Sequence, residues 1–98
     1  MNQTTDVEKI KDWLNKYLKN KLVLQAESEL VDDYIAMFQE NQNIVNAIHR
    51  VENPLYMALL VRRFVNGEKI EDIAEAMHYD ERQIRRLMNK ALLSVSTE

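Results

Sequence analysis

The 98-residue sequence contains no cysteine, one glycine (Gly67) and one proline (Pro54). Without cysteine the chain can form neither a disulfide nor a thiolate metal site, which fits a reducing compartment. So few turn-forming residues argue against a meander of short strands and favour helices joined by short links. The longest apolar run, residues 55–61, is far shorter than the roughly 20 residues of a membrane-spanning helix. Because residues 1–10 also lack the apolar core of a signal peptide, we expect a cytoplasmic protein without membrane contact.

The balance of residue types is that of one small globular unit, with 46% hydrophobic and 30% charged residues. The net charge of −3 is unevenly distributed. Residues 1–49 hold five basic and eight acidic side chains, whereas residues 50–98 hold eight of each. Within the second half the acids gather mainly in 68–75 and the bases mainly in 82–90. Local charge decides whether a surface attracts a polyanion, so the acidic total does not exclude nucleic-acid binding.

Hydrophobic spacing predicts an all-α fold of four or five helices. We expect an N-terminal helical pair in residues 1–52, used for packing or dimerisation, and a C-terminal three-helix unit in residues 53–98. The first helix is expected to begin at Thr5 or Asp6, with Thr5 as N-cap and Glu8 completing a capping box. It is expected to end near residues 20–21, followed by an extended or loop segment over residues 22–26.

A second helical period resumes at Glu27 and runs to about Val51 without glycine or proline. We expect one long helix, with residues 41–43 as its weakest point and a candidate break. The Asn53-Pro54 pair then forces a boundary, because the residue before proline avoids the α region and proline suits a first turn. Further helices are predicted over 54–65, 69–77 and 81–95, and the tail 96–98 is expected to fray.

Residues 70–87 have the pattern of two short helices joined by a tight turn. Ala74 is the small residue that such a helix crossing requires. Asp80 is a good N-cap for the second helix, and Gln83 at its N3 position permits a reciprocal cap. His78 occupies the turn position where glycine is common, and histidine tolerates a positive φ better than most residues. The apolar anchors predicted for this pair of helices are Ile70, Ile73, Met77, Tyr79, Ile84 and Leu87.

A helical wheel of the last helix separates two faces. Leu87, Met88 and Ala91 lie on the side of Ile84, and the basic and amide side chains lie on the other. Arginine donates bidentately to guanine, asparagine and glutamine bind adenine, and arginine or lysine also holds phosphate. The sequence therefore predicts binding of double-stranded DNA. The predicted DNA-binding residues are Arg82, Gln83, Arg85, Arg86, Asn89 and Lys90, with Arg82, Arg85 and Asn89 for bases and Arg86 and Lys90 for phosphate.

Two alternatives stay open at this point. First, the basic face of the last helix, if it does not bind DNA, is a solvated surface or is paired with Glu71, Asp72 and Glu75 of the preceding helix. In the N-terminal half, aromatic and methionine side chains at core spacing form either an internal core or a homodimer interface. The homodimer interface is considered because helix-turn-helix proteins often bind two half-sites as dimers. These N-terminal side chains are Trp13, Tyr17, Tyr34, Met37 and Phe38.

Residues 53–95 resemble the fourth region of bacterial sigma factors and the phage transcriptional regulators of the ArpU and RinA kind. The matching stretches are Asn53-Pro54, residues 63–67, residues 70–77, Tyr79-Asp80, and Ile84 to Leu87 with the closing residues 90–92. The resemblance implies a helix-turn-helix whose recognition helix, residues 80–90, enters the major groove. It implies a small regulator of phage or mobile-element origin, with RNA polymerase as a further candidate partner. The acidic first half has no sigma-like polymerase-binding segment.

No enzymatic chemistry is predicted, because the sequence has no glycine-rich phosphate loop and no nucleophile–base set. His49 and His78 lack carboxylates at ligand spacing, so we expect neither metal nor cofactor. Asp32 and Asp33 are adjacent, so on a helix their side chains diverge by about 100°. The competing functional hypothesis is a helical interaction module without base readout, such as a polymerase- or sigma-binding adaptor or a phage packaging subunit.

Overall fold

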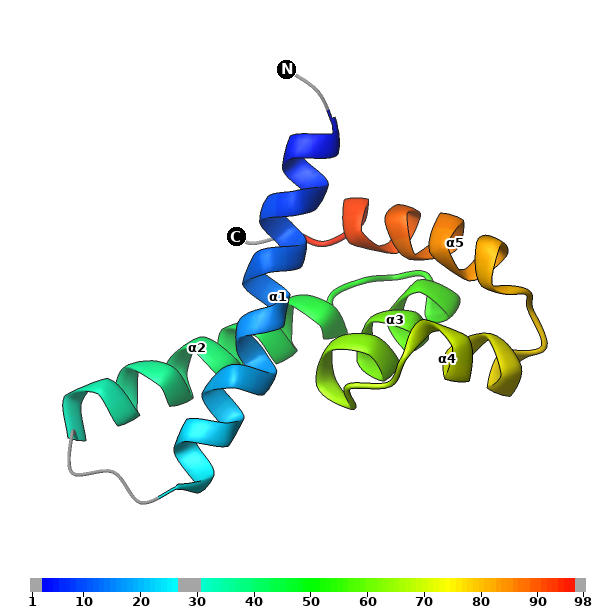
Figure 1. Cartoon of the computed structure of the whole chain (residues 1–98). Helices are drawn as coiled ribbons and strands as arrows, with labels where there is room; N and C mark the ends of the chain where they lie inside the picture. Colours follow the sequence, from blue (N-terminus) through cyan, green and yellow to red (C-terminus); the bar gives the residue numbers. More distant parts are fainter. Residues whose placement is uncertain (1–2, 27–30, 97–98) are drawn as a thin grey trace.

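The computed structural model describes residues 3–26 and 31–96, with side chains over 6–26 and 34–96. Within these ranges the chain forms five α-helices and one π-helical turn and no strand (Figure 1). The prediction of an all-α fold with four or five helices is confirmed. The elements are α1 (Gln3–Gln25), α2 (Val31–His49), α3 (Pro54–Leu60), η1 (Val61–Val65), α4 (Ile70–Met77) and α5 (Glu81–Leu93).

Helix α1 extends beyond its predicted limits at both ends. It begins at Gln3, so Thr5 lies inside the helix and the prediction that Thr5 caps its start is wrong. It also continues to Gln25, through most of the segment 22–26 that was predicted as extended or loop. Lysine, leucine and glutamine favour helix, and no glycine or proline interrupts them, so the last turn forms although Leu22 is 70% exposed.

Helix α2 is continuous across residues 41–43, so the candidate break does not occur. Its predicted start at Glu27 lies outside the described residues, and it ends at His49 rather than near Val51. The reason for its continuity is that Asn41 is buried and hydrogen-bonded to α1. Its Nδ2 donates to the backbone oxygen of Tyr17 at 3.1 Å. An amide that finds partners across a helix interface is stabilised there rather than breaking its own helix.

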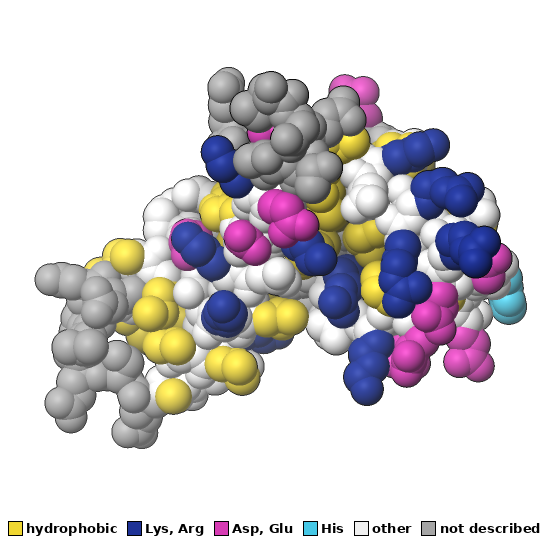
Figure 2. Space-filling view, turned by 45° about the horizontal axis from the view of Figure 1, so that its top comes forward, with side chains coloured by type: hydrophobic (Ala, Val, Ile, Leu, Met, Phe, Trp, Pro, Cys, Tyr) yellow, Lys and Arg dark blue, Asp and Glu magenta, His cyan; other side chains and the backbone are white. Residues whose placement is uncertain are grey.

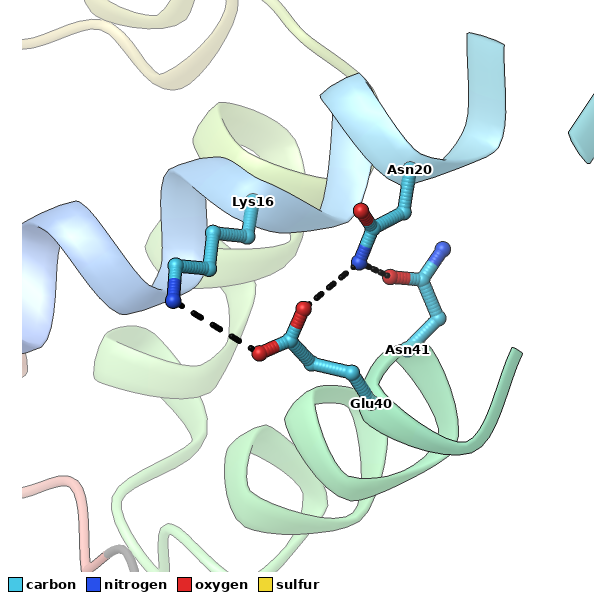
Figure 3. Close-up of polar contacts among 4 residues, drawn as sticks. All are labelled: Lys16, Asn20, Glu40 and Asn41. Carbon is cyan, nitrogen blue, oxygen red and sulfur yellow. Dashed lines mark hydrogen bonds and ion pairs between the residues drawn. The ribbon is translucent and has the colours of Figure 1, made fainter. Parts of the chain in front are cut away.

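Polar side chains around Asn41 join α1 to α2 (Figure 3). Asn20 Nδ2 donates to Asn41 Oδ1 at 3.0 Å and to Glu40 Oε1 at 2.8 Å. Lys16 Nζ lies 3.7 Å from Glu40 Oε2. The network fixes the position of α1 along α2, because each of these partners is lost if one helix slides past the other.

Helix α3 begins at the predicted Asn53-Pro54 boundary. Asn53 is the N-cap, and its side-chain oxygen accepts hydrogen bonds from the backbone N–H of residues 55 and 56. The predicted single helix over 54–65 changes to a π-helical turn at Val61, where the N–H of Asn66 donates to the Val61 oxygen at 2.9 Å. Gly67 follows with φ +73°, a left-handed conformation that suits glycine.

One hydrophobic core crosses the boundary between residues 52 and 53. Leu14 of α1 is fully buried in the same cluster as side chains from every other helix. The two predicted parts of the chain therefore share their interior. The buried cluster comprises Leu14, Ile44, Ile48, Val51, Leu59, Leu60, Phe64, Ile73, Ala74, Ile84, Met88, Ala91 and Leu92.

The predicted aromatic core of the N-terminal pair forms only in part. Trp13 and Tyr17 are half-buried against the shared core, and Met37 is also half-buried. Tyr34 and Phe38 are 40% and 54% exposed, so their assignment to an internal core is wrong. Among the described side chains of α2, the buried ones lie from position 41 onward, where α1 crosses α2 (Figure 1).

Candidate nucleic-acid interface

Helix α4 ends in a left-handed residue that redirects the chain into α5. His78 has φ 63° and ψ 38°, the only positive φ of a non-glycine residue among those described. The N–H of Tyr79 donates to the Ala74 oxygen at 3.0 Å, and that of His78 to the Glu75 oxygen at 3.3 Å. These two bonds form a Schellman motif. Histidine therefore performs the conformational role for which glycine is commonly used at this turn.

Tyr79 does not serve as the apolar anchor that its spacing predicted. It directly follows the left-handed residue and is 37% exposed. The other predicted anchors are buried or half-buried. Ile73 and Ala74 of α4 and Ile84 of α5 are all buried in the shared core, where the two helices meet.

The start of α5 is fixed by a side-chain cap. Asp80 is the N-cap, and its Oδ1 accepts a hydrogen bond from the N–H of Gln83 at 2.8 Å, as predicted. The helix then runs to Leu93, two residues short of the predicted end at Val95. Asp80 thereby orients the first turn, which carries Arg82 and Gln83.

Helix α5 has two distinct faces. Its buried residues are Ile84, Met88, Ala91 and Leu92, which face the shared core. The predicted DNA-binding side chains all lie on the exposed side of this one helix. These are Arg82, Gln83, Arg85, Arg86, Asn89 and Lys90.

The exposed side of α5 keeps its positive charge. Arg85 lies 3.5 Å from Glu81 on the same helix, and both side chains are well exposed. Such an exposed pair contributes at most about 1 kcal/mol. Arg82, Arg86 and Lys90 form no ion pair with any described residue, the α4 acids Glu71, Asp72 and Glu75 included. Figure 2 shows Lys and Arg side chains in a band over the part of the surface where Figure 1 places α5, with acidic side chains along one margin.

A groove beside α5 brings in two basic residues that sequence reasoning missed. Lys11 of α1 and Arg63 of η1 line it together with Arg85 and Asn89 of α5. The sequence offered only the outward position of Lys11 on its helix and the Arg62-Arg63 pair. Neither indicates that α1 and η1 lie against α5, which is a consequence of the shared core.

Other kinds of site find little support in the described residues. No three side chains of histidine, cysteine, aspartate or glutamate gather there in a way that could hold a metal ion. His49 is the last residue of α2 and His78 lies in the turn between α4 and α5, and both are exposed. In the same part of the chain, no helix combines the length and the apolar character that crossing a membrane demands.

No family model, curated protein or solved structure matches this chain.

Proposed function

We propose that this protein is a sequence-specific regulator of transcription that binds double-stranded DNA by placing α5 in the major groove. The observation that supports this most directly is the exposed side of α5. Four cations and two amides project from one helix whose opposite side is buried in the core. An α-helix fits the major groove, and these are the side-chain types that read base edges and hold phosphates there.

The helices before α5 support the same proposal. In a helix-turn-helix protein the first helix crosses the DNA backbone while the N-terminal residues of the second contact the bases. Here α4 and α5 are joined by three residues, with a left-handed His78 and a capping Asp80. The resemblance of residues 53–95 to the fourth region of sigma factors and to ArpU- and RinA-like phage regulators agrees with this arrangement. RNA polymerase is the second partner that the proposal includes.

Each side chain of α5 has a proposed role. Arg82, Arg85 and Asn89 contact base edges, and Gln83 is placed to bind adenine. Arg86 and Lys90 lie farther around the exposed side and contact phosphates. Base contacts determine which sequence is bound, whereas phosphate contacts set orientation and most of the salt dependence.

Selection of bound fragments from random DNA, followed by gel shifts at several salt concentrations, tests the proposal. We expect the wild-type protein to enrich a defined sequence. Arg86→Ala should weaken binding to all sequences alike and reduce the slope of log K against log salt by about 1. Arg82→Ala should lose about 1–3 kcal/mol of discrimination at one base pair. The matched control is Lys21→Ala, which removes one exposed charge from α1 outside α5 and its groove.

Two results would overturn the proposal. One is the absence of binding to any fragment at low salt. The other is equal weakening by Arg86→Ala and Lys21→Ala, which would indicate attraction by total charge alone.

One observation favours the alternative of a helical interaction module. Large apolar side chains are exposed on the other part of the molecule, over α2 and the last turn of α1 (Figure 2). In this alternative a second copy of the chain, or a polymerase-bound protein, covers that surface without base readout. Analytical ultracentrifugation of the wild-type protein and of the Phe38→Ser variant shows whether this surface forms a dimer. The exposed side chains are Leu22, Val23, Tyr34, Ile35 and Phe38.

A further inference from the structure

The groove beside α5 is built by three successive elements of the C-terminal half together with α1, which is distant from them in sequence. It has a volume of about 370 Å³ and lies between α1, η1, α4 and α5. Its apolar lining comes from the core, through Phe64, Met88 and Leu92, and from Ile70. Its polar lining consists of three cations and one amide, with no acidic side chain among the described residues that line it. These polar residues are Lys11, Arg63, Arg85 and Asn89.

Arg63 is held in place without being neutralised. It is half-buried, and its Nη1 donates to the backbone oxygen of Glu68 at 2.8 Å. That acceptor is uncharged, and the carboxylate of Glu68 is instead paired with Arg62 at 2.9 Å. Neither Arg63 nor Lys11 forms an ion pair with any described residue. A guanidinium has five N–H donors, so most of those on Arg63 remain available while its orientation is fixed.

The π-helical turn explains why both arginines of the pair reach the Glu68 region. Residues 61–65 wind more loosely than an α-helix, and the N–H of Glu68 donates to the Arg62 oxygen at 2.9 Å. The turn thus folds back on η1, so that Arg62 meets the Glu68 carboxylate and Arg63 meets its carbonyl. π-helical turns are often found at functional sites. Here the turn places Arg62 in an ion pair with Glu68 and leaves Arg63 without an ion pair among the described residues.

The groove is continuous with the exposed side of α5, because Arg85 and Asn89 belong to both. A DNA strand that borders a major groove occupied by α5 would run beside this helix. Cations from three different elements line the groove, and one of them, Arg63, is oriented by a backbone hydrogen bond. They match the charge and the acceptor oxygens of a phosphodiester.

We infer that this groove binds a backbone phosphate of the DNA duplex, so that α1 and η1 form part of the DNA interface. The inference rests on the proposed function and extends it. Lys11 and Arg63 supply the charge-assisted hydrogen bonds, and Arg85 links this phosphate to the bases beneath α5. The interface therefore includes the N-terminal half of the chain, which the sequence assigned to packing or dimerisation.

The test is the salt dependence of binding to a fluorescein-labelled duplex of mixed sequence. Lys11→Gln and Arg63→Gln should each weaken binding, and the double variant should reduce the slope of log K against log salt by about 0.9, the value for one phosphate contact. Lys19→Gln, an equal loss of charge at another exposed position of α1, should leave the slope unchanged. Because Lys11 is exposed, its variant remains informative even where Arg63→Gln fails to fold.

Outcomes separate this inference from the proposed function. If Arg86→Ala lowers the slope while Lys11→Gln and Lys19→Gln behave alike, α5 binds DNA and the groove does not, which overturns the inference alone. If the wild-type protein binds no duplex, both fail.

An NMR titration distinguishes the source of the phosphate. The amide signals of Lys11 and Arg63 should shift on addition of duplex. An equal shift with inorganic phosphate at the same phosphate concentration would make the groove a site for the free anion, and the inference would be wrong.

Discussion

His78 illustrates how much a single residue can determine. A non-glycine residue at positive φ is uncommon, although histidine is among the types that tolerate it. At this position it closes the Schellman motif that ends α4 and turns the chain toward α5. The conformation of His78 was anticipated from its place between two helical periods. The exposure of Tyr79 was not, because spacing along the chain does not reveal the direction in which a left-handed residue sends its successor.

We expect His78→Gly to stabilise the protein by about 0.5–1 kcal/mol, because glycine adopts the left-handed conformation without a steric penalty from a β-carbon. His78→Val should destabilise it, since a β-branched residue is strongly disfavoured there. Urea denaturation followed by circular dichroism measures both changes. A glycine variant less stable than wild type would show that the histidine side chain makes a stabilising contact of its own.

At the scale of the helix, α4 and α5 were predicted within two residues of their observed ends. Both are short and strongly amphipathic, and the turn between them is marked by the left-handed His78 and the N-cap Asp80, so local sequence was sufficient. α1 was predicted less well, because its last turn is exposed and the sequence there has neither glycine nor proline to mark an end. The groove was not predicted at all. It depends on Lys11, Arg63 and Arg85 meeting through tertiary packing, and no local pattern records which helices lie side by side.

Asp80 has opposing effects at the start of α5. Its side chain caps the helix, yet its negative charge lies next to the proposed base-reading residues. Asp80→Asn should retain the cap, because asparagine caps as well as aspartate. It should also bind DNA several-fold more tightly, because it removes the negative charge beside the base-reading residues. Asp80→Ala should lose about 1 kcal/mol of stability. Thermal unfolding and fluorescence anisotropy on the same two variants separate these effects. A loss of affinity in Asp80→Asn would contradict the placement of this turn beside DNA.

At the scale of the whole molecule, the shared core makes α1 a structural part of the C-terminal unit. Leu14 is completely buried and belongs to the same cluster as Leu59, Phe64 and Ile84. Hydrophobic spacing along the sequence predicts an apolar side for each helix. It did not predict that the two parts would have one interior, because amphipathic faces specify burial without specifying the partner.

Leu14→Ala should therefore destabilise the whole protein by about 2–5 kcal/mol, the usual effect of emptying a buried leucine site. The matched control is Leu22→Ala on the same helix, which should change stability by no more than about 0.5 kcal/mol because Leu22 is 70% exposed. Chemical denaturation should show a single transition in both variants. Separate transitions for the two halves in Leu14→Ala would contradict a common core.

The exposed basic side of α5 has a consequence for the speed at which the molecule meets a polyanion. Its four cations lie on the surface opposite the core, and among the described residues only Arg85 pairs with a carboxylate. In the field of a nucleic acid, a surface of this charge is attracted before contact, which raises the rate of encounter. The association rate should therefore fall as the ionic strength rises.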